Sequence, residues 1–178
     1  MERTVGLSKA GRKSGGLGAR VVIRAMQEDD LAAVSGVLCE CYRWLGKREK
    51  YTPEQIEFLV SKRGSVECVS RESREQHYFV ACIEWNVVGI ASILENVITK
   101  LYVAPACQRK RIGTQLFATA EAVIRSAGYE CMTLGAFPTA VEFYKAMGLA
   151  VTGQKPCGPS RLAGLSVTLM QKCFEKKA

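Results

Sequence analysis

The chain has 178 residues, of which 48% are hydrophobic and 24% are charged, a balance that suits one domain with a substantial core. It contains no apolar run long enough to span a bilayer and no continuous apolar stretch for export, so we expect a cytoplasmic protein without a membrane partner. Half of the formal net charge of +8 lies in residues 1–20, which we expect to form a flexible, basic, glycine-rich tail before a domain at 21–178. The charge left on this domain is too small to favour nucleic acid as a partner.

The cysteines carry no recognisable metal or disulfide pattern. Eight of them are scattered along the chain without a C-x-x-C pair, and the chain has a single histidine, His77. Zinc sites need clustered thiolates or imidazoles, so we expect no bound metal. Several cysteines stand in apolar runs such as Val80–Ile83, where a reduced thiol packs as a small hydrophobic side chain.

The first elements predicted along the chain are a strand and a helix. Residues 19–25 are rich in valine and isoleucine, which is typical of a strand. Asp29 and Asp30 offer an N-cap for a helix whose apolar face continues to Leu45.

A second helix and a run of strands follow. Thr52 and Gln55 form the pattern of a capping box, with Pro53 in the first turn, which predicts a helix that ends at about residue 62. Valine, isoleucine and aromatic residues then indicate three strands, of which the first two form a hairpin: 77–85, 87–94 and 97–103.

The second half of the chain alternates helices with strands. One helical stripe runs from Ile112 to Gly128 and another ends at Gly148, because glycine is favoured just past the end of a helix. Strands are expected at 131–134, 149–152 and 165–174. This order predicts an α/β (α+β) fold, a mixed sheet with helices on its faces.

A basic loop between a strand and a helix is the most informative segment. The strand ends at Val103, the loop holds Arg109, Lys110 and Arg111, and the helix begins near Gly113. Helix starts expose unpaired N–H groups and the positive end of the helix dipole, so such a loop can hold a phosphate. The alternative is a solvated basic loop, and the residues alone leave both interpretations open.

The loop resembles the acetyl-CoA signature of the GCN5-related N-acetyltransferases (GNAT), V-x-P-x-x-Q-x-x-G-x-G/A. Arg111 stands where the signature has its first glycine, and a positive φ there would cost about 1–2 kcal/mol. The other signature positions match at Val103, Pro105, Gln108 and Gly113. The family's second motif, A-x-x-F-Y-x-x-x-G-[FL], is matched by Ala140, Phe143, Tyr144, Gly148 and Leu149.

The resemblance extends over about residues 21–174, because the order of elements also matches the family. It implies a mostly antiparallel sheet of about six or seven strands with helices on both faces. It further implies that acetyl-CoA binds along one strand and the basic loop, at Leu101, Tyr102, Val103, Gln108, Arg109, Lys110, Arg111, Ile112, Gly113, Thr114 and Tyr144.

The resemblance also implies catalytic groups. Tyr144 occupies the place of the family's general acid beside the CoA sulfur. Many relatives place a glutamate base where this chain has Thr99, so we take Glu95, further back on the same strand, as the candidate base. The alternative for Glu95 is a turn residue that faces solvent.

The family's first two helices shape the acceptor pocket. In this chain that region offers Tyr42, Trp44 and Tyr51 as an apolar or aromatic lining. Its cations favour a small or acidic acceptor: Arg43, Lys47, Arg48 and Lys50. The alternative assigns the aromatic rings to the core and the cations to a solvated surface.

The resemblance therefore implies an enzyme that moves an acetyl group from acetyl-CoA to a primary amine of a small molecule or peptide, by direct attack in a ternary complex. Thr99 and Arg111, the two departures from the family pattern, also permit a non-catalytic acyl-CoA-binding or regulatory module. A nucleic-acid-associated role for residues 1–20 is a third interpretation. Dimers are common in the family, so a homodimer is compatible with this assignment.

Overall fold

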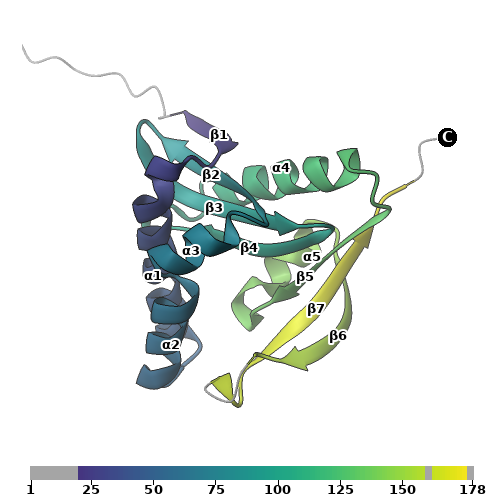
Figure 1. Ribbon diagram of the computed structural model, residues 1–178. Helices are drawn as coiled ribbons and strands as arrows, with labels where there is room; N and C mark the ends of the chain where they lie inside the picture. The colour runs from purple at the N-terminus through teal and green to yellow at the C-terminus, as the bar shows by residue number, and fades with distance from the viewer. Residues whose placement is uncertain (1–19, 159–161, 176–178) are drawn as a thin grey trace, which may run out of the picture.

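The computed structural model describes residues 20–158 and 162–175, so the predicted tail lies outside the described residues except for Arg20. One sheet of seven strands forms the centre of the protein, in the order β1-β2-β3-β4-β5-β7-β6 (Figure 1). Neighbouring strands are antiparallel, except that β4 and β5 are parallel. The predicted fold class is confirmed. The strands are β1 Val21–Ala25, β2 His77–Ile83, β3 Asn86–Leu94, β4 Val97–Val103, β5 Cys131–Ala136, β6 Ala150–Pro156 and β7 Ser166–Cys173.

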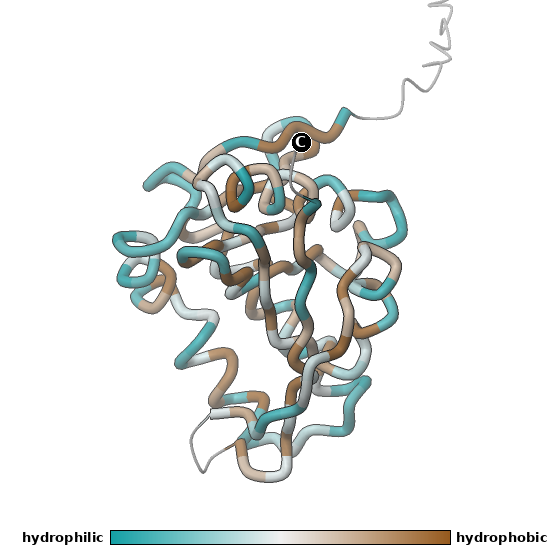
Figure 2. The backbone as a smooth tube through the Cα atoms, turned by 90° about the vertical axis from the view of Figure 1, so that its right-hand side faces the viewer, coloured by the Kyte–Doolittle hydropathy of each residue, from teal (hydrophilic) through white to brown (hydrophobic). Residues whose placement is uncertain are grey.

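Helices cover both faces of this sheet. On one face lie α1 (Leu31–Arg48), α2 (Pro53–Arg63) and α3 (Val66–Glu72), and on the other lies α4 (Ile112–Ser126), with α5 (Val141–Ala146) after β5 (Figure 1). Apolar side chains of α1 to α3 pack on β2 and β3, whereas α4 packs on β2 to β5. Hydrophilic segments lie mainly on the outer turns (Figure 2). No helix within the described ranges is long and apolar enough to cross a membrane.

The structure confirms one predicted helix start and corrects another. Thr52 Oγ1 accepts from the Gln55 N–H at 3.2 Å, and Gln55 Oε1 accepts from the Thr52 N–H at 2.9 Å, which completes the capping box of α2. Asp30 does not cap α1 with its side chain. Its carboxylate accepts from Arg24, at 2.5 and 2.8 Å, and from the Gln27 N–H at 2.8 Å, so it closes the short 3-10 turn before α1.

Helix α3 is the element that the sequence prediction missed. Ser65 caps it by accepting from the Cys68 N–H at 3.2 Å. The helix has 7 residues, of which Cys68 and Val69 are buried, so it is too short to show a helical period. The other predicted elements are present with shifted ends: β5, for example, continues to Ala136.

The sheet divides between β4 and β5. Among the described residues, β4 and β5 are in register only where Val97–Ile98 faces Thr133–Leu134. The register between β3 and β4 shifts beside Ser92, which leaves Thr99 as an extra residue, a β-bulge, on β4. We call the point where β4 leaves β5, just after Ile98, the fork.

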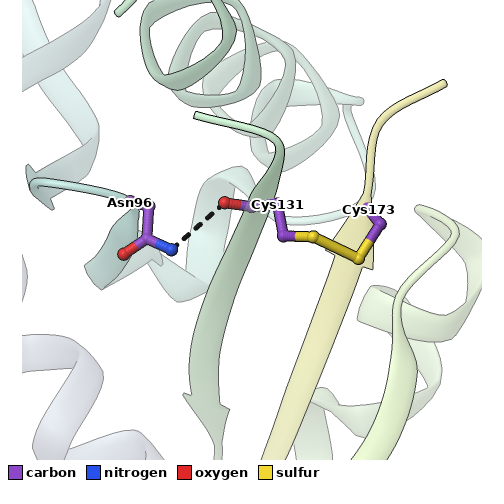
Figure 3. The surroundings of a disulfide bond; sticks show 3 residues. All are labelled: Asn96, Cys131 and Cys173. Carbon is purple, nitrogen blue, oxygen red and sulfur yellow. Dashed lines mark hydrogen bonds between the residues drawn. A yellow bond between two sulfur atoms is a disulfide. The ribbon is translucent and has the colours of Figure 1, made fainter. Parts of the chain in front are cut away.

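On its other side β5 is joined firmly to β7. The two strands are in register from Cys131 with Cys173 to Ala136 with Thr168. Cys131 and Cys173 form a disulfide across the strands, with their Cα atoms 4.0 Å apart, and the Cys131 carbonyl accepts from Asn96 Nδ2 at 3.1 Å (Figure 3). The expectation that the cysteines pack as reduced thiols is therefore wrong for this pair. The free thiols are Cys39, Cys41, Cys68, Cys82, Cys107 and Cys157.

Candidate functional site

A cavity of about 470 Å³ opens beside the fork. Its walls come from α1, the far half of β4, the basic loop with the first turn of α4, and the segment from the end of β5 into α5. The lining residues are Cys41, Trp44, Leu45, Leu101, Tyr102, Val103, Cys107, Gln108, Arg109, Arg111, Ile112, Gly113, Thr114, Phe137, Thr139, Ala140, Phe143 and Tyr144.

The β4 wall of this cavity presents backbone groups. The Ala104 N–H donates to the Val88 carbonyl on β3 at 2.9 Å. Backbone groups of successive strand residues point to opposite sides, so those of Leu101 and Val103 point away from β3 and toward the cavity. β4 has left β5 at this point, so the outward groups of Leu101 and the N–H of Val103 can pair with an extended ligand, whereas the Val103 carbonyl accepts from side chains of the protein.

The basic loop turns tightly through two residues with left-handed backbone. Arg109 has φ 61° and Arg111 has φ 60°, and each pays about 1–2 kcal/mol relative to a right-handed conformation. The Gln108 side chain donates through Nε2 to the Val103 carbonyl at 3.3 Å, which fixes the loop against the end of β4. The first N–H groups of α4, at Ile112 and Gly113, have no acceptor within the helix and stand at the positive end of its dipole.

Tyr144 is the buried hydroxyl of the cavity. The residue is 7% exposed, and its ring centroid lies 5.1 Å from that of Phe143 and 6.3 Å from that of Phe117. Burial raises the pKa of Tyr144 well above its usual value, so the hydroxyl keeps its proton at neutral pH. Within the described part of the chain the hydroxyl has no hydrogen-bond partner, so it is available to a ligand.

Aromatic side chains form the wall nearest α1. Trp44 is half-buried and lines the cavity, with the Arg48 guanidinium 5.4 Å from its ring centroid. Tyr51 packs 6.3 Å from Phe137, which lines the cavity from the end of β5. Tyr42 lies behind this wall, edge-on to Tyr102 at 5.2 Å and buried in the core.

The structure brings together most of the predicted site residues but not all of them. The predicted cofactor residues line the cavity with the exception of Lys110. Glu95 lies exposed in the turn between β3 and β4, at the other end of β4 from the cavity, and Thr99 donates to Gln76 Oε1 at 2.6 Å. The structure therefore does not bring Glu95 to Tyr144.

Several lining residues were not predicted from the sequence. Cys41 and Leu45 enter the cavity from α1, and Cys107 enters from the loop after β4. The Cys41 thiol donates to the Val103 carbonyl at 3.4 Å, and burial raises its pKa to about 12. An apolar helical stripe gives the face of α1 but does not indicate which of its members reaches a cavity.

The sequence matches the protein family described as an acetyltransferase (GNAT) domain over residues 47–174. The chain belongs to this GNAT family. The match covers the fork, the basic loop and both motif segments, so the resemblance seen in the sequence is confirmed.

Solved GNAT structures share the fold. A GCN5-related N-acetyltransferase from Rhodopseudomonas palustris has a TM-score of 0.80 at 22% identity, covering 90% of this chain and 100% of that one. The PaiA N-acetyltransferase from Thermoplasma acidophilum, solved with coenzyme A, has a TM-score of 0.70 at 21% identity, covering 87% and 99%. YncA from Salmonella typhimurium, solved with acetyl-CoA, has 0.63 at 19%, covering 89% and 96%. At these levels of identity the similarity shows that the proteins share a fold.

Proposed function

We propose that this GNAT protein transfers an acetyl group from acetyl-CoA to a primary amine of a small molecule or peptide, by direct attack in a ternary complex. The observation that carries the proposal is one cavity in which the open edge of β4, the start of α4 and the Tyr144 hydroxyl meet. Acetyl-CoA would supply the activated acyl thioester. The protein's residues would hold it, orient it and assist the departure of the thiolate.

The residues of the cavity fit a diphosphate with an extended arm. Arg109 and Arg111 supply positive charge beside the free N–H groups of α4. A Cβ at Gly113 would lie 3.5 Å from the Phe143 ring, an ordinary contact, so the packing of the protein does not require glycine here. Close approach of an anion to the backbone would require it. The outward groups of Leu101 and the N–H of Val103 can then pair with the amide-containing arm.

We assign Tyr144 the role of hydrogen-bond donor to the departing sulfur. Its raised pKa keeps the donor proton in place at neutral pH, when a thiolate with an ordinary pKa of about 8.5 develops. Because the hydroxyl is the weaker acid, it stabilises the developing charge without giving up its proton completely. The acceptor amine would enter along the wall of Trp44 and Phe137, where the Arg48 cation favours an acceptor that also bears a carboxylate or phosphate. We retain the cytoplasm as the proposed location because six of the eight cysteines are free thiols, which suits a reducing compartment, whereas the Cys131–Cys173 disulfide is of a kind more common in oxidising compartments.

Calorimetry with CoA and an amine screen that detects released thiol test this proposal. We expect CoA to bind the wild-type protein and Gly113→Ala to weaken binding about tenfold, the equivalent of about 1.4 kcal/mol. Gly36→Ala is the matched control, because Gly36 is an exposed glycine within α1 with open space around its Cβ position. Absence of CoA binding to the wild-type protein would refute the proposal. Binding without turnover on a broad amine panel would support the non-catalytic alternative instead.

A further inference from the structure

A buried ion pair lies directly behind the fork. Lys100, the residue after the bulge on β4, donates through Nζ to Glu72 Oε2 at the end of α3. The Lys100 side chain is 3% exposed and that of Glu72 is 17% exposed. A lysine so far from water is rare in proteins and needs a partner that compensates its charge.

Glu72 is held in turn by other groups. The Tyr78 hydroxyl donates to Glu72 Oε2 at 2.7 Å, and the Cys68 thiol donates to Oε1 at 3.4 Å. The Lys100 ammonium also lies 5.9 Å from the centroid of the Tyr78 ring. Burial alone would raise the pKa of Glu72, but the hydrogen bond and charge of Lys100 bring this pKa below its usual value, so the Glu72 carboxyl is ionised at neutral pH.

The neighbouring bulge residue has its own polar partners in the same segment. Thr99 donates to Gln76 Oε1 at 2.6 Å, and the Ser92 hydroxyl of β3 lies 2.7 Å from the Thr99 hydroxyl. Both residues that follow the fork are therefore tied to α3 and the turn after it. The next residues along β4 are Leu101 to Val103, which line the cavity.

We propose that the Lys100–Glu72 pair is a positioning device for acyl transfer, which fixes the rotation of β4 just after the fork and so aims the outward backbone groups of Leu101 and Val103 into the cavity. The directional hydrogen bonds of the pair specify one orientation of the strand, which apolar packing specifies less sharply. β5 gives no support beyond Ile98, so this stretch of β4 is held by β3, by the packing of α1 and α4, and by α3 through the ion pair. The pair touches no reacting atom and acts through the strand. The inference rests on the proposed function.

The test compares single and double neutral variants. Glu72→Gln leaves a buried cation without its counter-charge, so it should lower the melting temperature most, whereas Lys100→Met leaves a partly exposed carboxylate and should lower it less. In the double variant Lys100→Met/Glu72→Gln neither charge remains, and Gln still accepts from Tyr78. We expect its melting temperature to return close to that of the wild type.

A positioning role of the ion pair and a purely structural role predict different activities for this double variant. We expect kcat to stay about tenfold below the wild type while the Kd of CoA, set mainly by the basic loop, changes less than about threefold. In the ligand-free protein the amides at 101–103 should exchange faster with solvent. The matched control is Lys172→Met/Glu121→Gln, a partly buried pair between β7 and α4 with an Nζ–Oε2 distance of 2.7 Å, which should change none of these quantities.

The outcomes separate this inference from the proposed function. If the wild type neither binds CoA nor turns over, the proposed function itself has failed. If the wild type is active and the refolded double variant matches it in kcat and in exchange at 101–103, the pair is only structural and the inference is overturned.

Discussion

Strand β5 has two sides that differ sharply in how they are held. Toward β7 it is paired along its whole length and crosslinked through Cys131 and Cys173. Toward β4, among the described residues, it is in register only at Thr133–Leu134. The edge of β5 that faces β7, which we call the closed side, joins the C-terminal strands into one unit. The edge that faces β4, the open side, leaves backbone groups of β4 exposed to the cavity. In this protein the site lies where the sheet leaves its hydrogen bonds unmade.

The largest expected effect comes from changing the hydroxyl at the open side. Tyr144→Phe should lower kcat about 10²- to 10³-fold, because the departing sulfur loses its donor, while the Kd of CoA changes little. The variant keeps the ring packing against Phe143 and Phe117, so its melting temperature should match that of the wild type. Stopped-flow detection of free thiol measures the step. Turnover equal to the wild type on a good acceptor would remove Tyr144 from the mechanism.

The next largest effect is expected from removing the disulfide between β5 and β7. Cys173→Ser removes a crosslink between residues 42 positions apart and should lower the free energy of unfolding by about 2–4 kcal/mol. Denaturant unfolding under non-reducing conditions measures this change, with Cys157→Ser, a partly buried free thiol, as the control. CoA affinity should be the same in both variants. A loss of CoA binding in Cys173→Ser alone would show that the two sides of β5 are not independent.

The smallest expected effect comes from relieving the backbone strain at Arg111, which lines the cavity. Arg111→Gly should raise the free energy of unfolding by up to about 1 kcal/mol, because glycine adopts positive φ without a steric cost. It should also weaken CoA binding about threefold, since a cation leaves the cavity wall. Lys50→Gly is the matched control, with φ 57° at an exposed position outside the cavity. It should gain stability and leave CoA affinity unchanged. An affinity loss of the same size in both variants would contradict a role for the Arg111 charge.

Elements with a strong local signal could be predicted from the sequence. The capping box at Thr52 and the glycine ends at Gly128 and Gly148, with φ of 87° and 88°, appear in the structure as the residues indicated. The local signal failed at α3, which is too short to show a period, and at Asp30, whose carboxylate binds Arg24 from β1. The second failure is a tertiary contact, which nothing in the local sequence encodes.

The site divides in the same way. The basic loop and the Tyr144 segment are short motifs, and each of them brings several residues to the cavity, although Lys110, Gly148 and Leu149 do not line it. Glu95 was chosen from its place along a strand, and the strand carries it to the turn, away from the cavity. Phe137, by contrast, reaches the cavity because β5 diverges from β4, a feature of strand pairing that the sequence of either strand alone does not show.

Helix α4 packs across the place where β4 and β5 diverge. Its residues Ile112 and Leu116 pack with β2, β3 and the far half of β4, whereas Phe117, Ala120 and Ile124 pack with β5 and Tyr144. The same helix therefore packs against both parts of the divided sheet, and the volume of its buried side chains sets the distance between these two parts. A smaller side chain at the core residue Phe117 would therefore let β4 and β5 move closer together. The cavity would become narrower although none of the residues that line it had changed.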